Sequence, residues 1–163
     1  MTLPGAWGSI AREGFMSDDT TRAIELVETT IRGLGVDPSA ARIPGDDKTR
    51  AYALRRGSAR VVVAVGRGEG GGGTLRVLAP VVSVPDAASE AKVFRRLLEL
   101  NAREISGAAF GIFGDEIVVV VERTTKDLDA SEVDQIVKTV GRVADRWDDA
   151  LAKEFGLKRA SDA

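Results

Sequence analysis

Apolar residues recur every three or four positions in three segments of the chain, which is the spacing of a helix with one buried face. The predicted helices cover residues 18–33, 87–103 and 129–155. The last of them has the clearest boundaries. Asp129 and Glu132 have the spacing of a capping box, in which two side chains accept hydrogen bonds at the start of a helix, and Gly156 follows the last apolar position.

Five other segments are rich in β-branched residues, as strands are. The predicted strands are 48–55, 59–66, 74–83, 108–114 and 116–122. Pro80 lies inside the third, and because proline cannot donate to a ladder it predicts an edge strand or a bulge. Gly114-Asp115 between the last two predicts a tight hairpin.

The predicted order is therefore helix, three strands, helix, two strands and helix, which describes an α+β domain. We expect one domain over residues 17–156. Residues 1–16 show no period and are expected to form a flexible N-terminal arm, although Trp7 within it could dock on the domain or on a partner. Residues 157–163 are expected to be a frayed tail, and Gly70–Gly73 a flexible connection between two strands.

Composition excludes several classes of function. The 163 residues carry a net charge of −2 with both signs interspersed, which is unlike the concentrated basic surface that binds nucleic acid or a membrane. The chain contains no cysteine and no histidine, so thiol chemistry and the commonest metal ligands are absent. No secretory signal or membrane span is predicted, so we expect a bacterial-type cytoplasmic protein without metal, cofactor or small-molecule substrate.

Two motifs suggest chemistry but lack necessary parts. Gly66–Gly71 satisfies G-x-G-x-x-G after a strand, but a dinucleotide site needs a helix directly after the glycines, and here another strand follows. Ser89–Lys92 matches the S-x-x-K of serine acyl-enzymes, but the accompanying S-D-N and K-T-G motifs are missing. We therefore predict no catalytic residue in either segment.

Asp145, Asp148 and Asp149 share one face of the last predicted helix. Such carboxylates could perform acid–base chemistry or bind Mg²⁺. We instead expect Arg142 and Arg146, within one turn, to neutralise them on a solvated face.

Asn101 lies on the apolar stripe of the second predicted helix. A polar side chain buried there without partners would cost about 1–3 kcal/mol. We expect it to bond the last carbonyls of its own helix, and the alternative is a contact with a bound segment.

The strands also predict a surface that lacks a cover. A sheet packed on one face should alternate apolar and polar residues, but segment 116–122 is apolar on both faces, and Glu116 and Glu122 mark the outer one. In two other strands, alternate residues that share a face with a charged end are also apolar. Together these strands place five residues on the outer face, namely Val62, Leu78, Val82, Val118 and Val120. Leaving this face in water would lose about 25 cal/mol of free energy for each Å² of apolar surface that is not buried. We predict that a client segment, a second copy or a misplaced element of the chain covers these five residues.

Three stretches are similar to the YbjN-type bacterial sensory transduction regulators, and the order of elements resembles the type III secretion chaperone-like fold. The stretches are 75–85, 97–122 and 127–151. The features that carry the resemblance are Leu97, Leu98 and Asn101, then Gly107, Phe110 and Gly111, then Ala144-Asp145 and Trp147. The resemblance implies an α-β-β-β-α-β-β-α fold with one antiparallel sheet and helices packed mainly on one face. It also implies a protein-binding module that is often a homodimer.

Three functions follow from these observations. The leading hypothesis is a non-enzymatic adaptor or chaperone-like protein that binds a segment of a client and is possibly regulatory by the family label. The alternative is an obligate homodimer whose apolar sheet face serves self-association. An enzyme using the aspartates or Ser89 and Lys92 is the least favoured, since each motif lacks a part.

Overall fold

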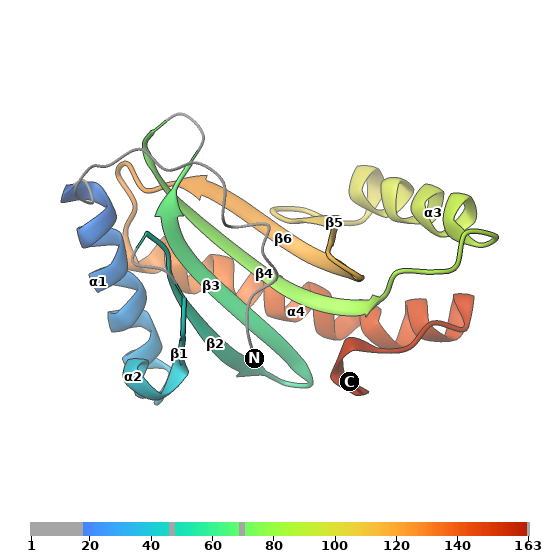
Figure 1. Ribbon diagram of the computed structural model, residues 1–163, viewed down its shortest axis with the longest axis horizontal. Helices are drawn as coiled ribbons and strands as arrows, with labels where there is room; N and C mark the ends of the chain where they lie inside the picture. Colours follow the sequence, from blue (N-terminus) through green and yellow to red (C-terminus); the bar gives the residue numbers. More distant parts are fainter. Residues whose placement is uncertain (1–17, 46–47, 69–70, 163) are drawn as a thin grey trace. The chain divides into compact units, whose positions relative to one another are not determined.

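A computed structural model describes residues 18–45, 48–68 and 71–162 (Figure 1). The expected arm, residues 1–16, lies outside these ranges, as does Gly70. The helices are α1 (Asp18–Gly33), α2 (Pro38–Ala41), α3 (Glu90–Arg103), α4 (Ala130–Phe155) and the 3₁₀ turn η2 (Ala160–Asp162). The strands are β1 (Arg42–Ile43), β2 (Arg50–Arg56), β3 (Ala59–Arg67), β4 (Gly73–Ser83), β5 (Ala109–Phe113) and β6 (Glu116–Thr124). The three long helices and five strands predicted from the sequence are all present.

The strands form one six-stranded antiparallel sheet in the order β1-β2-β3-β4-β6-β5. Strand β4, which contains Pro80, lies between β3 and β6, so the prediction of an edge strand is wrong. Proline forgoes only one ladder bond, and the 11-residue β4 retains the others. The sequence pattern also missed α2 and the two-residue β1.

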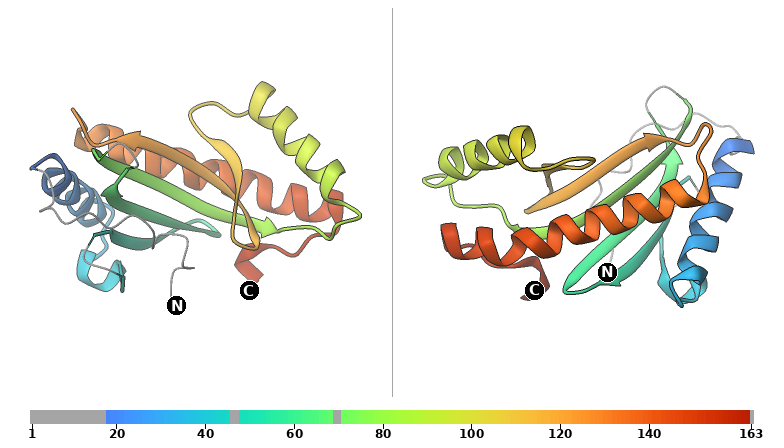
Figure 2. Two further views of the ribbon diagram at one scale, coloured as in Figure 1. Left: turned by 45° about the horizontal axis from the view of Figure 1, so that its top comes forward. Right: turned by 180° about the vertical axis from the view of Figure 1, so that it is seen from behind.

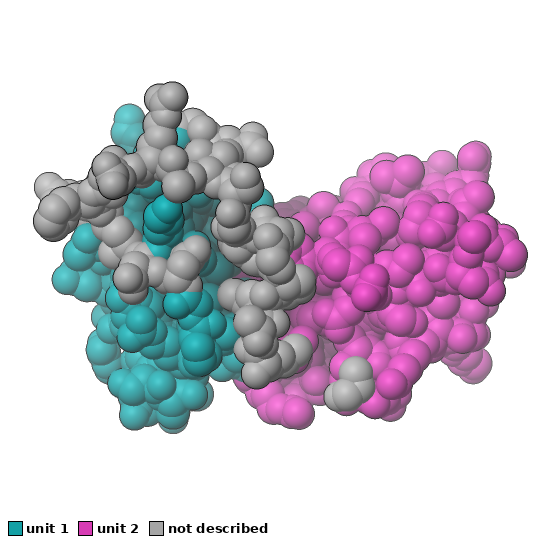
Figure 3. Space-filling model, viewed as in Figure 1, with its two compact units in different colours: residues 1–54, 62–76, 122–135 teal, residues 55–61, 77–121, 136–163 magenta. Residues whose placement is uncertain are grey.

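The chain divides into two compact units, which are coloured separately in Figure 3. The first contains residues 1–54, 62–76 and 122–135, and the second contains 55–61, 77–121 and 136–163. In the first, Val27, Ile31 and Tyr52 are among the fully buried side chains. The second contains all of α3 and β5 and most of α4. There α4 lies along one face of the strands (Figure 2), with Gly141 against Arg56 and Val61.

Local capping explains where the helices begin. The Glu132 N–H donates to Asp129 Oδ1 at 2.9 Å, and the Asp129 N–H donates to Glu132 Oε2 at 3.1 Å. This reciprocal pair confirms the predicted capping box at the start of α4. Helix α3 begins at Glu90, three residues later than predicted, because the Ser89 N–H donates to the carboxylate and the carbonyl of Asp86 and holds the intervening residues in a turn.

The β5–β6 hairpin has the predicted position. Phe113 pairs with Glu116, so Gly114-Asp115 is a two-residue loop. Gly114 has a φ of 59°, a region open to glycine at no steric cost, and it occupies the first central position as in a type II′ turn.

Residues 158–162 differ from the expected frayed tail. The Ser83 N–H donates to the Lys158 carbonyl at 2.9 Å, and Val82 forms an antiparallel bridge with Arg159. The chain therefore returns to β4 after α4 ends.

Candidate protein-binding surface

The five residues predicted to contact a partner are mostly inaccessible. Val62, Leu78, Val82 and Val118 are at most 7% exposed, and only Val120 is half-buried. Four of the five are therefore already covered within this chain, as in the predicted alternative of a misplaced element. Val62 belongs to the first unit and the other four to the second, and the backbone of Val82 is paired with Arg159. Their assignment as partner contacts stays a prediction.

Large apolar side chains are exposed elsewhere in the second unit. Leu98 on α3 is 68% exposed and Ile112 on β5 is 54% exposed. The opposite face of α3 is buried through Val93, Leu97 and Leu100. Because burying a leucine or isoleucine side chain is worth about 1.5–3 kcal/mol, two such exposed side chains favour a contact with another polypeptide.

Asn101 attaches α3 to the edge strand β5. Its Nδ2 donates to the Phe110 carbonyl at 3.2 Å, and its Oδ1 accepts from the Phe110 N–H at 2.7 Å. The side-chain amide thus bonds a strand backbone as a neighbouring strand would. The expectation that Asn101 bonds the carbonyls of its own helix is wrong, because its partner lies nine residues further along the chain.

The bonds of Asn101 show which way the backbone of β5 faces. In an antiparallel pair, residues alternate between those that bond the neighbouring strand and those that point away. The backbone N–H and C=O of Phe110 point away from β6, since they bond Asn101. Ile112 lies two residues further along β5, so its backbone groups point in the same direction. The outer edge of β5 therefore presents the N–H and C=O of Ile112 beside its exposed side chain. We call Ile112 with Leu98, Asn101 and Phe110 the α3–β5 surface.

Charged and aromatic side chains fix α3 against α4. Arg96 lies 3.6 Å from Glu154 and 5.8 Å from the centre of the Trp147 ring. Lys92 lies 5.8 Å from the centre of the Phe155 ring. Partly exposed contacts of this kind contribute about 1 kcal/mol or less each, so they orient the helix more than they stabilise it.

The three aspartates of α4 have structural partners. Ser58 Oγ donates to Asp145 Oδ1 at 2.7 Å and lies 3.1 Å from Asp148 Oδ2. The Ser58 hydroxyl and N–H hold the pKa of Asp145 below its ordinary value of 3.8. Asp149 pairs with Arg159 at 2.6 Å. Asp145 and Asp148 therefore accept hydrogen bonds from Ser58, and the cation that pairs with Asp149 is Arg159 rather than the predicted Arg142 or Arg146.

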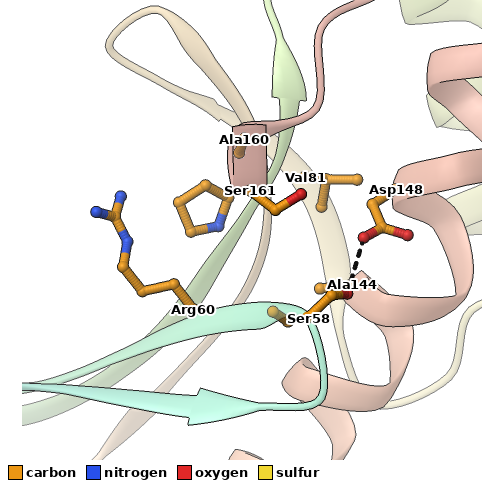
Figure 4. Close-up of a pocket in the computed structure, with 9 residues that line it drawn as sticks. Ser58, Arg60, Val81, Ala144, Asp148, Ala160 and Ser161 are labelled. Atoms are coloured by element: carbon orange, nitrogen blue, oxygen red, sulfur yellow. Dashed lines mark hydrogen bonds between the residues drawn. The ribbon is translucent and has the colours of Figure 1, made fainter. Parts of the chain in front are cut away.

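A small pocket adjoins these aspartates (Figure 4). Ser58, Arg60, Pro80 and Val81 line it together with Asp148. Its volume of about 20 Å³ holds one water molecule, which is too small for an organic substrate. Within the described ranges, no group of three or more carboxylates could hold a metal ion.

The other two motifs also have structural roles. Gly68 and Gly71 lie in the turn where the Gly68 N–H donates to the Gly72 carbonyl at 2.8 Å, and β4 begins at Gly73. No helix follows the glycines to bind a pyrophosphate. Lys92 lies 5.8 Å from the centre of the Phe155 ring, where its ammonium group makes a cation–π contact.

Comparison with known proteins gives a family match over most of the chain. The family described as "T3SS (YopN, CesT) and YbjN peptide-binding chaperone 1" matches residues 22–163, where T3SS denotes the type III secretion system. No curated protein sequence matches at a significant level. Among residues that the structure describes, no helix combines the length and the apolar character needed to cross a bilayer.

Several solved structures share the fold at low sequence identity. The structure of the ExsC–ExsE complex is 16% identical with a TM-score of 0.58, covering 81% of this chain and 95% of that one. The HopA1–SchA chaperone–effector complex is 9% identical with a TM-score of 0.56, covering 83% and 99%. The ExoU–SpcU complex from the type III secretion system of Pseudomonas aeruginosa is 15% identical with a TM-score of 0.51, covering 75% and 94%.

Proposed function

This chain belongs to the family of type III secretion and YbjN peptide-binding chaperones, and we propose that it binds an extended segment of a client protein at the outer edge of β5. The family is one of binding proteins rather than enzymes. The observation that carries the proposal is the edge strand itself. Ile112 offers an outward N–H and C=O together with a side chain that is 54% exposed.

A strand added to a sheet edge gains its affinity from main-chain hydrogen bonds and its specificity from alternate side chains. The Asn101 amide already bonds the outward groups of Phe110, which supports a partner of strand-like geometry at this edge. A client strand would lie next to β5 beyond Phe110, whose backbone Asn101 bonds, and would pair with Ile112. The named complexes of similar fold include a chaperone with its effector, which supports a client that is itself a protein segment.

The decisive variant is Ile112→Pro, which removes the outward N–H. That N–H is not part of the β5–β6 ladder, so proline is tolerated there as on other edge strands. Peptides selected from a random library against the wild-type protein serve as probes, with binding measured by fluorescence anisotropy. Loss of one main-chain hydrogen bond, about 1 kcal/mol, predicts an affinity roughly fivefold weaker.

Ile112→Val is the matched control, because it keeps both the N–H and a β-branched side chain. It should bind the selected peptides within about threefold of the wild type. Circular dichroism and the amide signals of Gly111 and Phe113 would confirm that the hairpin survives the proline. Equal affinity of the proline variant for every selected peptide would exclude pairing at this edge.

A second candidate function is self-association through the outer face of α3. Leu98 is 68% exposed and shares this face with the exposed Ala91 and Ala102 at helical spacing. Arg95 and Glu99 flank Leu98 and pair at 3.4 Å within the helix. With a twofold axis near Leu98, Arg95 of one copy could pair with Glu99 of the other, and the reverse. Such reciprocal pairing is what a self-complementary interface requires.

Sedimentation over a concentration series tests this candidate. Leu98→Glu should weaken a dimer at least tenfold, because the apolar anchor is replaced by a charge. Thr21→Glu places the same charge on an exposed position of α1 and should leave the dimer intact. A wild-type protein that stays monomeric up to about 100-fold above 1 μM would exclude self-association through α3.

Binding a client segment would also let the protein regulate when that client becomes available. We place this activity in the cytoplasm, in keeping with the family and with the absence of cysteine in the chain.

A further inference from the structure

Residues 158 and 159 pair with the end of β4 through an isolated bridge, and residues 160–162 continue as the 3₁₀ turn η2. Lys158 accepts a hydrogen bond from the Ser83 N–H, and Arg159 forms the bridge with Val82. On the other side of β4, the Val84 N–H donates to the carbonyl of Asp115. The returning segment therefore supplies the missing neighbour on one side of β4, where it bonds an otherwise open backbone.

Arg159 anchors this segment. Its Nη1 donates to Asp149 Oδ1 on α4 at 2.6 Å. Its Nε and Nη2 donate to the two carboxylate oxygens of Asp162 at 3.0 and 2.9 Å. Because Asp162 belongs to the segment itself, Asp149 is the one residue, among those that the structure describes, that ties the guanidinium to the rest of the unit.

Two small residues follow the arginine into the pocket described above. Ala160 and Ser161 line it opposite Val81 and Asp148 (Figure 4). A larger side chain directed into the pocket from either position would not fit the remaining space of about 20 Å³. The bound segment thus has a defined pattern, which is a backbone pair, an arginine and two small residues.

The contacts that hold the segment are few and partly open to water. The side chains of Arg159 and Asp149 are 37% and 79% exposed, and an ion pair of that exposure contributes little. Neither Ala160 nor Ser161 is buried. Segments held by so few contacts open locally at low free energy, so this one can exchange with a competitor.

We propose that the Val82–Ser83 backbone, Asp149 and the adjoining pocket form a second peptide-binding site, which residues 158–162 occupy in cis and thereby close to other segments. The partner it fits is a protein segment whose arginine pairs with Val82 and is followed by two small residues in a turn. The proposal extends the proposed function, since it assumes that the protein binds client segments, but it concerns a different strand from β5. A client that carries this pattern would displace residues 158–162.

The full-length Arg159→Asp variant opens the site. An aspartate at this position faces Asp149 and Asp162 and repels both. This repulsion, added to the loss of the weak ion pair, should displace the segment from β4, and the Ser83 amide should exchange with deuterium at least tenfold faster than in the wild type. Arg22→Asp makes the same charge change at an exposed position of α1 and should leave Ser83 unaffected.

A synthetic peptide with the sequence of residues 157–162, LKRASD, then tests binding in trans. In an NMR titration it should shift the Ser83 amide of the Arg159→Asp protein. The wild type should bind it roughly tenfold more weakly, because its own segment is tethered at high effective concentration. The same peptide with aspartate in place of arginine should fail to bind.

Two results would overturn the proposal. One is a Ser83 amide that stays equally protected in Arg159→Asp. The other is an opened protein that ignores the arginine peptide, since residues 158–162 would then be only a fixed end of the fold. If Arg159→Asp does not fold, Arg159→Ala removes the anchor without adding repulsion. Ile112→Pro should leave LKRASD binding unchanged, so a failure at β5 and a failure at this site are distinguishable.

Discussion

Removing the side-chain amide of Asn101, which bonds the backbone of Phe110, tests the α3–β5 surface most directly. Asn101→Ala removes both hydrogen bonds to Phe110, at 3.2 and 2.7 Å. A net hydrogen bond contributes about 0.5–1.5 kcal/mol, so the pair contributes about 1–3 kcal/mol. Phe110 is only 7% exposed, which limits replacement of both bonds by water and makes the low end of this range too small, so we expect about 2 kcal/mol.

For a chain of this size, about 2 kcal/mol lowers the Tm by about 4–8 °C. Urea denaturation followed by circular dichroism measures the free energy of unfolding. Hydrogen exchange at the Phe110 amide measures the local effect, which should exceed the global one because β5 is an edge strand. Ala102→Ser, at the exposed neighbouring position, is the control and should change stability by less than about 0.5 kcal/mol.

Two results together would contradict this prediction. They are a free energy of unfolding of Asn101→Ala within about 0.5 kcal/mol of the wild type and a Phe110 amide that exchanges at its wild-type rate. The side-chain amide would then be incidental to the position of β5. The edge would have to be fixed by its ladder with β6 alone.

Three further substitutions test the fold. Gly141→Ala should destabilise by about 1 kcal/mol despite the helix propensity of alanine, because its Cβ would lie 2.9 Å from Arg56 Cβ; urea denaturation measures this. Asp129→Ala should lower the Tm at pH 7 by removing the cap, and calorimetry across pH should show this difference disappear in acid. Tyr52→Phe should abolish a loss of stability above pH 10, because burial and the hydrogen bond to Glu28 raise the pKa of this tyrosine.

The signs of the two pH effects follow from the pKa shifts. The Ser131 hydroxyl and the Glu132 N–H lower the pKa of Asp129, so its stabilisation is present above the ordinary value of 3.8 and is lost as pH falls through the folded-state pKa. For Tyr52 the folded-state pKa is higher than the unfolded value of 10, so stability is present below pH 10 and falls as pH rises. Tyr52 is the chain's single tyrosine, so its absorbance titrates it directly.

Each of these predictions has a control in the same chain. Gly33→Ala should be neutral or stabilising, since no heavy atom lies within 4 Å of that Cβ position. Gly141→Ala behaving like Gly33→Ala would contradict the steric argument. Asp129→Asn keeps a cap acceptor but cannot titrate, so its acid dependence should be smaller than that of the wild type. A Tyr52 that ionises near pH 10 in the folded protein would refute the alkaline prediction.

Sequence alone determined the elements whose cause is local. The period of α1 and the capping box at Asp129 and Glu132 place two helix boundaries, because caps and periodicity involve residues within one or two turns. The Gly114-Asp115 hairpin was also predicted, since a two-residue loop between β-branched segments has few alternatives. The absence of cysteine and histidine excluded most site chemistry without any structure.

Only the tertiary structure decided which surfaces are open. Strand parity grouped Val118 with Val82, but parity gives the face of a side chain and not what lies against it, and both are buried. The partner of Asn101, the inner position of β4 and the return of Arg159 to Val82 also depend on pairing between distant segments. Such pairing leaves no periodic signal in either segment, because each of these contacts involves backbone groups that nearly every residue carries.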